Sequence, residues 1–142
     1  NSRLDNLQAA ILDYKLQNYD NLIKKRETIV EMYNDTLSKF DIDYLPFREK
    51  KRGTRYVYQN YEIRIKNRDK FKQKINENGV GTLIQWGGKS VDEFKIFNDK
   101  FNLPKTRDYL KSSLMLPLNE YLTFDEVDYI CKVIKKACEE TN

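Results

Sequence analysis

The sequence predicts an α+β fold in which a small, mostly antiparallel sheet is covered by helices. Three observations lead to this prediction. Apolar residues recur at helical spacing near both ends of the chain, three short segments between them resemble strands, and the two kinds of segment are interleaved without an internal repeat. The length of 142 residues suits one domain with a core of its own.

Residues 4–40 are expected to be helical, with a break near residues 18–20. The apolar residues at helical spacing are Leu4, Leu7, Ile11 and Tyr14 before the break, and Leu22, Ile29, Tyr33, Leu37 and Phe40 after it. This pattern is typical of helices that pack on a core. Each of the two helices should therefore bury one apolar face.

A strand is expected over residues 54–66, because β-branched and aromatic residues alternate there with period two. The residues that share one side of it are Val57, Gln59, Tyr61, Ile63 and Ile65. A helix over 68–78 should follow, with Phe71 and Ile75 facing inward. Gly79 stands where many helices end in the left-handed conformation.

Two further strands are expected over residues 80–86 and 112–119, the second stopped by Pro117. Between them the sequence indicates a helical turn over 91–97 and a short helix that starts at Arg107. The strands and helices together give the order expected of an α+β domain.

The last helix has a clear beginning. Thr123 and Glu126 can form a capping box, and Leu122 and Val127 can form a hydrophobic staple. Its inward face should consist of Val127, Ile130, Cys131, Ile134 and Cys138. The two cysteines are separated by a helical rise of about 10.5 Å, whereas a disulfide needs Cα atoms within about 7 Å. They should not form a bridge with each other.

Composition and charge narrow the classes of function. The net charge is +4, with basic and acidic residues intermixed. No apolar run is long enough for a membrane span and no signal-peptide pattern is present, so we expect a cytoplasmic protein without a membrane partner. The chain has no His and no Cys-x-x-Cys pair, which argues against a metal site or a His-based triad.

The string GVGTLIQWGGKSVDEF (79–94) suits a ligand pocket. Paired glycines let a backbone approach a ligand closely, and Trp86 beside them offers a flat apolar wall with one N–H donor. The alternative is a glycine turn with an ordinary surface lysine.

Together with NSRLDNLQAAIL (1–12), this string resembles the DegT/DnrJ/EryC1/StrS family of pyridoxal-phosphate-dependent sugar aminotransferases. The later string is most similar to enzymes that aminate a dTDP-linked 3-oxo-6-deoxyhexose. LMLPLN (114–119) also matches the family's closing strand, where packing explains it. The resemblance implies that residues 1–142 are the small C-terminal domain of a fold-type I aminotransferase, without its large pyridoxal-phosphate-binding domain.

The resemblance also implies roles for particular residues. Asn1 and Arg3 would reach the cofactor phosphate bound by the other subunit of a homodimer, although Asn1 or Ser2 could merely cap a helix. The residues that would bind the nucleotide-sugar substrate are Gln85, Trp86, Gly87, Gly88 and Lys89. One position departs from the subgroup, which usually has His where this chain has Asp92. The sugar preference is therefore left open.

The implied activity of the parent enzyme is transfer of an amino group from glutamate to a keto carbon of a nucleotide-linked deoxysugar. The family's Schiff-base lysine lies upstream of the Asn-x-Arg motif, so the resemblance places no catalytic residue in this segment and the segment alone should be inactive.

A competing hypothesis is a small domain that binds acidic polymers or nucleic acid through residues 48–56. That segment is rich in cations, and Tyr56, Tyr58 and Tyr61 near it could stack on bases. A half-buried sheet face beside a solvated loop explains the same residues, and we favour that explanation, with no nucleic-acid partner.

Overall fold

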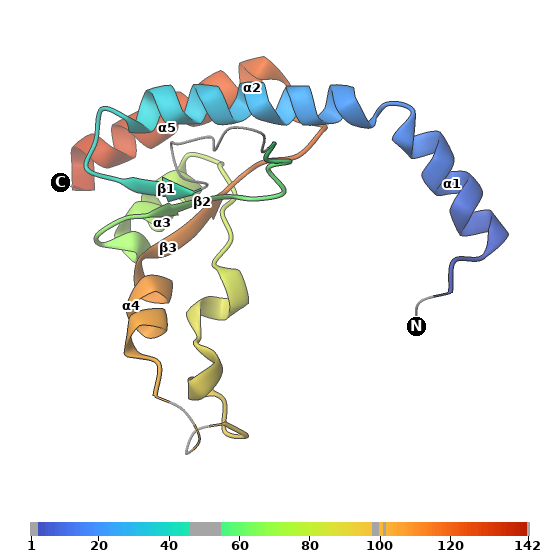
Figure 1. Ribbon diagram of the computed structural model, residues 1–142. Coiled ribbons are helices and arrows are strands. Elements are labelled where there is room, and N and C mark those ends of the chain that lie inside the picture. Colours follow the sequence, from blue (N-terminus) through green and yellow to red (C-terminus); the bar gives the residue numbers. More distant parts are fainter. Residues whose placement is uncertain (1–2, 46–54, 98–99, 101, 142) are drawn as a thin grey trace.

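The computed structural model describes residues 3–45, 55–97, 100 and 102–141. A three-stranded antiparallel sheet with the order β1-β2-β3 lies at its centre (Figure 1). Its strands are β1 (Asp43–Leu45), β2 (Tyr61–Arg64) and β3 (Ser113–Leu116). Ile63 in β2 lies opposite Tyr44 on one side and Leu114 on the other. The predicted α+β class and antiparallel sheet are confirmed.

Helices precede, separate and follow these strands in the chain. The order of the helices is α1 (Asn6–Leu16), α2 (Tyr19–Leu37), α3 (Arg68–Glu77), α4 (Pro104–Ser112) and α5 (Phe124–Thr141), with single helical turns at Gln85–Gly88 and Val91–Glu93. The long helices α2 and α5 contact each other, and α3 contacts α5 (Figure 1). Among the described residues, no helix is both long and apolar enough to cross a membrane.

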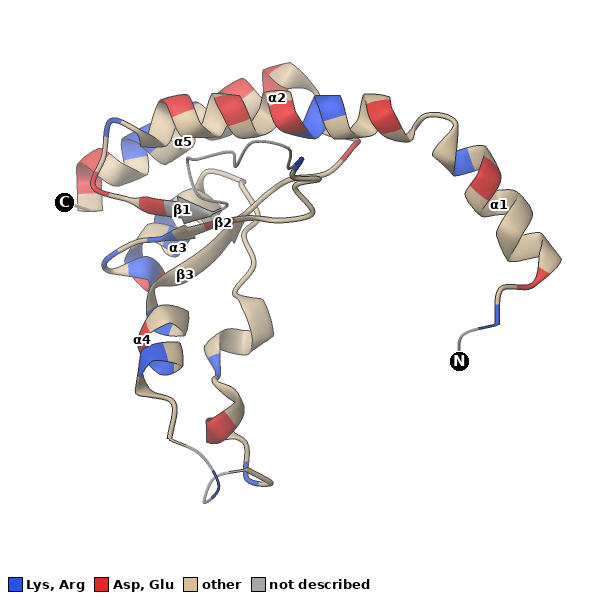
Figure 2. Cartoon of the chain, viewed as in Figure 1, with Lys and Arg blue, Asp and Glu red and all other residues tan. Residues whose placement is uncertain are grey.

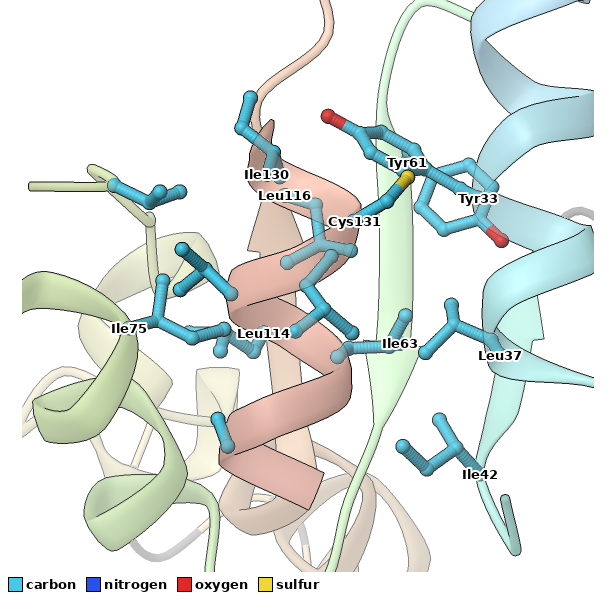
Figure 3. Close-up of a cluster of buried hydrophobic side chains, with 14 of the residues drawn as sticks. Tyr33, Leu37, Ile42, Tyr61, Ile63, Ile75, Leu114, Leu116, Ile130 and Cys131 are labelled. Carbon is cyan, nitrogen blue, oxygen red and sulfur yellow. The ribbon is translucent and has the colours of Figure 1, made fainter. Parts of the chain in front are cut away.

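The core lies between α2, α3, α5 and the sheet. Figure 3 shows Leu37, Ile63, Leu114 and Ile75 converging from four different elements. Each of these four side chains is fully buried, and burial of one such side chain stabilises the fold by about 1.5–3 kcal/mol. The core therefore joins segments that are far apart in the sequence.

Two buried tyrosines keep their hydroxyl groups satisfied within this core. The Tyr33 and Tyr61 rings have centroids 5.0 Å apart. The Tyr33 hydroxyl donates to the Pro117 carbonyl oxygen at 2.8 Å, and the Tyr61 hydroxyl donates to Asn34 Oδ1 at 2.6 Å. Burial raises the pKa of Tyr33, so its hydroxyl stays protonated and remains a donor.

The beginning and the inward face of α5 are as predicted. The Thr123 N–H donates to Glu126 Oε2 at 2.7 Å, and the Glu126 N–H donates to Thr123 Oγ1 at 3.2 Å, which completes the capping box. All five predicted inward residues are buried. Cys131 and Cys138 are free, buried thiols.

The expectations for α3 and for the break before α2 are also confirmed. Phe71 and Ile75 are fully buried, and Gly79 has a φ of +76°. The short helix α4 begins at Pro104, three residues before the expected start, because proline suits the first turn of a helix.

All three predicted strands were too long. Within residues 112–119, the strand β3 spans Ser113–Leu116 and ends before Pro117, as expected. Within residues 54–66, only Tyr61–Arg64 is a strand. Tyr58 has a φ of +48°, which shifts the alternation, so Tyr58 is buried while Val57 and Gln59 are exposed. Within residues 80–86, Leu83 alone forms a bridge, to Met115 in β3.

The predicted burial of α1 was wrong. The helix forms, and Asp5 caps it by accepting a hydrogen bond from the Gln8 N–H at 2.8 Å. However, α1 has no buried residue, and Leu7 is 72% exposed. Figure 1 shows α1 bending away from α2 and from the sheet. Its apolar side chains are therefore left uncovered within the described residues.

Candidate functional site

The candidate site is the turn formed by residues 85–89, hereafter the 85–89 turn. It begins where the chain leaves the sheet. The Leu83 N–H donates to the Met115 carbonyl oxygen at 3.2 Å, and the Met115 N–H donates back to Leu83 at 2.8 Å. Ile84 then packs partly buried against the core. The first end of the turn is thus held on β3.

Three consecutive residues of this turn are left-handed. The φ angles are +53° at Trp86, +64° at Gly87 and +72° at Gly88. Glycine takes this conformation freely, whereas a residue with a side chain costs about 1–2 kcal/mol there. Left-handed positions of larger residues cluster at functional sites. Tyr58 also has a positive φ but is buried in the core, whereas Trp86 takes this conformation at an exposed position.

The turn presents its larger side chains outward. Trp86 is 75% exposed, Lys89 is exposed and Gln85 is half-buried. Within the described residues no carboxylate forms an ion pair with Lys89. An indole ring, an amide and an ammonium group are therefore available to a ligand at one place on the surface.

Gly88 fixes the other side of the turn against α3 and α4. A Cβ atom at Gly88 would lie 3.3 Å from Ile84 Cγ2 and 3.8 Å from the Leu110 carbonyl oxygen. Arg68 Nη1 donates to that same Leu110 oxygen at 3.2 Å and to the Ser113 oxygen at 3.3 Å. The glycine is needed for close approach as well as for its positive φ.

Asp92 lies just beyond the turn and faces inward. Its side chain is fully buried. Oδ2 accepts hydrogen bonds from the Leu103 N–H at 2.9 Å and from Arg107 Nε at 2.9 Å, and it also pairs with Arg107 Nη2. Hydrogen bonds from Arg107 are the main reason that the pKa of Asp92 is held well below its usual range. The residue that departs from the subgroup thus has an internal partner.

The structure does not bring the two predicted groups of site residues together. Asn1 lies outside the described residues. Arg3 is exposed and precedes α1, which extends away from the rest of the fold (Figure 1). Gln85, Trp86, Gly87, Gly88 and Lys89 do form one continuous turn.

The structure weighs against the tyrosine stacking surface of the competing hypothesis. Residues 48–54 lie outside the described part of the chain. Tyr58 and Tyr61 are buried, and Tyr56 packs partly against the core. Arg55 forms ion pairs with Asp20 at 3.1 Å and Glu27 at 3.5 Å. The tyrosines therefore serve the core, because two of them turn inward.

Charge is unevenly distributed over the helices. Figure 2 shows that α3 and α4 carry more basic than acidic residues, whereas α2 and α5 carry more acidic ones. The 85–89 turn contacts α4 and therefore lies at the basic end of the fold. A positive field favours an anionic ligand at that end.

Curated relatives resemble nearly the whole chain. An aminotransferase of Pseudomonas aeruginosa that acts on UDP-2-acetamido-2-deoxy-3-oxo-D-glucuronate is 29% identical over 134 residues, which cover 94% of this chain and 36% of that protein. A dTDP-3-amino-3,6-dideoxy-alpha-D-galactopyranose transaminase of Aneurinibacillus thermoaerophilus is 26% identical and covers 96% of this chain and 37% of its own length. The chain thus spans little more than a third of these relatives.

Solved structures and a family model also match nearly the whole chain. An aminotransferase from Brucella abortus superposes with a TM-score of 0.80 at 27% identity, over 96% of this chain and 36% of its own. Spr1654 of Streptococcus pneumoniae, assigned as a sugar aminotransferase and solved in its PLP form, shares the fold with a TM-score of 0.83 at 21% identity, over 97% of this chain and 36% of its own. The model of the DegT/DnrJ/EryC1/StrS aminotransferase family matches residues 1–135. The chain belongs to this family.

Proposed function

We propose that this chain forms the small C-terminal domain of a pyridoxal-phosphate-dependent sugar aminotransferase, and that its 85–89 turn closes one wall of the nucleotide-sugar pocket. The observation that carries the proposal is Trp86, which is left-handed and 75% exposed. Core packing gives no reason for a strained, exposed Trp, whereas a ligand wall does.

Each side chain of the turn has a role suited to its chemistry. The indole of Trp86 would cover an apolar face of the sugar or base and offer its N–H. Lys89, which has no described ion-pair partner, would attract the diphosphate as a movable point charge. Gln85 can both donate to and accept from a sugar hydroxyl. The basic residues of α3 and α4 would add attraction for the same anion.

We also propose a keto carbon of a nucleotide-linked deoxysugar as the amino acceptor and glutamate as the donor. The names of the two curated relatives mention UDP in one case and dTDP in the other, and both refer to position 3 of the sugar. This supports position 3 of the acceptor. The substrate assay compares the two nucleotides.

The phosphate group of the cofactor would contact this chain. Arg3 is exposed and has no ion-pair partner within the described residues, so its guanidinium is free to bind an anion. Together with Asn1, it would hold the phosphate of a cofactor bound by the second subunit of a homodimer. Pyridoxal phosphate, when bound, carries the amino group between donor and acceptor. The lysine that would hold it covalently is not assigned to this chain.

The exposed apolar side chains of α1 support a larger assembly. Leu7, Ile11 and Tyr14 are each more than half exposed. A depression of about 570 Å³ lies where α1 meets α2, lined in part by Tyr19 and Tyr121. Apolar surface of this kind is seldom left bare on a monomer. We propose that the large domain or the second subunit covers it.

The test uses a full-length enzyme that carries this chain. Trp86→Ala should raise KM for the nucleotide sugar by about 5- to 150-fold, the equivalent of 1–3 kcal/mol. Cofactor absorbance should not change. Phe124→Ala is the matched control, because Phe124 is 49% exposed at the start of α5 and lies outside the turn. UDP- and dTDP-linked 3-oxo sugars are compared as substrates. Unchanged kinetic constants for Trp86→Ala would place the pocket elsewhere.

A further inference from the structure

The segment 85–97, hereafter the arm, contains little regular structure. It includes two single helical turns and runs beside α4 (Figure 1). Trp86 and Lys89 are exposed within it, so burial of their own side chains does not determine where they lie. Their position must come from other residues of the arm that contact the rest of the fold.

Gly88 and Asp92 are two such residues, and they lie on either side of Lys89. A Cβ atom at Gly88 would lie 3.8 Å from the Leu110 carbonyl oxygen, so the arm passes close to the end of α4. Asp92 binds Leu103, immediately before α4, and Arg107 in its first half. The arm is therefore bonded to the start of this short helix and passes close to its end.

The contact of Asp92 has the geometry of a strong attachment. One carboxylate oxygen accepts from a backbone N–H and from the Arg107 guanidinium. The carboxylate is fully buried, whereas the Arg107 side chain is 39% exposed. Charge-assisted hydrogen bonds shielded from water are both directional and strong. Removing either partner should therefore release the arm.

This attachment is separate from the hydrophobic core. Leu110 is the buried apolar residue of α4, and it is not part of the hydrophobic core cluster, although buried apolar residues of α2, α3 and α5 are. If a contact stabilised the whole fold, its removal would also destabilise α5 and the sheet. The contact between Asp92 and Arg107 joins only the arm to α4.

We infer that Asp92 and Arg107 are positioning residues, which hold the arm on α4 so that Trp86 and Lys89 meet the nucleotide sugar in a fixed geometry. This inference rests on the proposed function of the 85–89 turn. It also gives a physical role to the position at which this chain departs from the resembling subgroup.

The first experiment uses this chain, in which Trp86 is the only Trp. Asp92→Asn keeps the shape and removes the charge, and Asp92→Asn combined with Arg107→Gln removes both charges. Hydrogen exchange at Lys89, Glu93 and Phe94, whose N–H groups are bonded within the arm, should become at least about tenfold faster. The fluorescence anisotropy decay of Trp86 should gain a fast component. Exchange in α5 should not change.

The control is Asp108→Asn, which removes an exposed ion pair with Arg64 from the same helix α4. It should leave exchange in the arm unchanged. If Asp92→Asn also accelerates exchange in α5, Arg107→Lys replaces it, because it keeps the charge and loses only the planar fork. Unchanged exchange in the arm for every variant at Asp92 and Arg107 would overturn the inference.

The second experiment measures kinetics in the full-length enzyme. Arg107→Gln should raise KM for the nucleotide sugar roughly tenfold or more, with kcat and cofactor absorbance little changed, and Arg107→Lys should restore part of the loss. If Trp86→Ala raises KM and Arg107→Gln does not, the positioning role is wrong while the pocket stands. If neither raises KM, the proposed function of the turn fails, and the positioning role fails with it.

Discussion

Lys89 illustrates how much a single residue depends on its neighbours in this domain. The residue before it lies against α4, the residue after it is buried, and Lys89 itself points to solvent. Its freedom is therefore limited to its own side chain. An ammonium group in such a place acts through charge more than through shape.

Lys89→Ala should raise KM for the nucleotide sugar, by about three- to tenfold at low salt and less at high salt, because salt screens an exposed charge. The measurement is steady-state kinetics in the full-length enzyme at two ionic strengths. Lys95→Ala is the matched control, since Lys95 is exposed on the same arm. An effect that does not depend on salt would argue against a charge contact with the substrate.

Thr123→Ala should lower the free energy of unfolding by about 0.5–2 kcal/mol, because it removes the N-cap of α5. Urea denaturation measures the change. Thr106→Ala serves as the control, since Thr106 is exposed on α4. Equal effects of the two substitutions would show that the capping box contributes nothing specific.

The capping box also predicts a dependence on pH. Hydrogen bonds from the Thr123 N–H and hydroxyl lower the pKa of Glu126 in the folded state. The carboxylate therefore stabilises the fold above its ordinary titration range, near pH 4–5. This contribution is lost as pH falls through the lowered pKa. The stability difference between the wild-type chain and Glu126→Gln should shrink on acidification, and a difference that grows would contradict the assignment.

At the scale of whole elements, α1 differs from every other helix. Its cap and helical turns are complete, yet it buries nothing within the described residues. Local hydrogen bonds determine where α1 begins, but they do not pack the helix against the rest of the domain. A helix of 11 residues is marginal in water on its own. Apolar side chains such as Leu7 and Tyr14 are therefore exposed on α1 in the described part of the chain.

Replacing Leu7 and Ile11 together by Gln should reduce self-association of the isolated chain and leave its melting temperature almost unchanged, because both side chains are more than half exposed. Sedimentation velocity and thermal denaturation provide the two measurements. Val30→Ala, in the buried face of α2, should lower the melting temperature and should not reduce self-association. A large loss of thermal stability in the Gln variant would show that α1 packs on this domain.

At the scale of the whole molecule, we propose that this chain supplies binding surfaces to a larger enzyme. The proposed site lies on an arm, the helix α1 is bare, and the family resemblance places no catalytic residue here. We expect the isolated chain to transfer no amino group from glutamate to UDP- or dTDP-linked 3-oxo sugars in the presence of pyridoxal phosphate. The assay is detection of 2-oxoglutarate, and turnover above that of a heat-denatured sample would contradict the prediction.

Much of this structure follows from local patterns in the sequence. The capping box of α5, the left-handed Gly79 and the inward residues of α3 and α5 depend on interactions within a few positions, which side-chain chemistry determines directly. The motif at 85–89 was likewise evident, because paired glycines beside a Trp are unusual in a strand.

The tertiary structure decided what local patterns leave open. Tyr58 turns inward through a positive φ and ends the alternation that suggested a longer strand. Arg107 and Asp92 are fifteen residues apart, and only the path of the arm past α4 brings them together. Helical spacing predicted the helix α1, but the buried face expected of it is wrong, because spacing carries no information about whether another surface packs on a helix. Burial and long-range pairing are properties of the packed chain, so they could be read only from the fold.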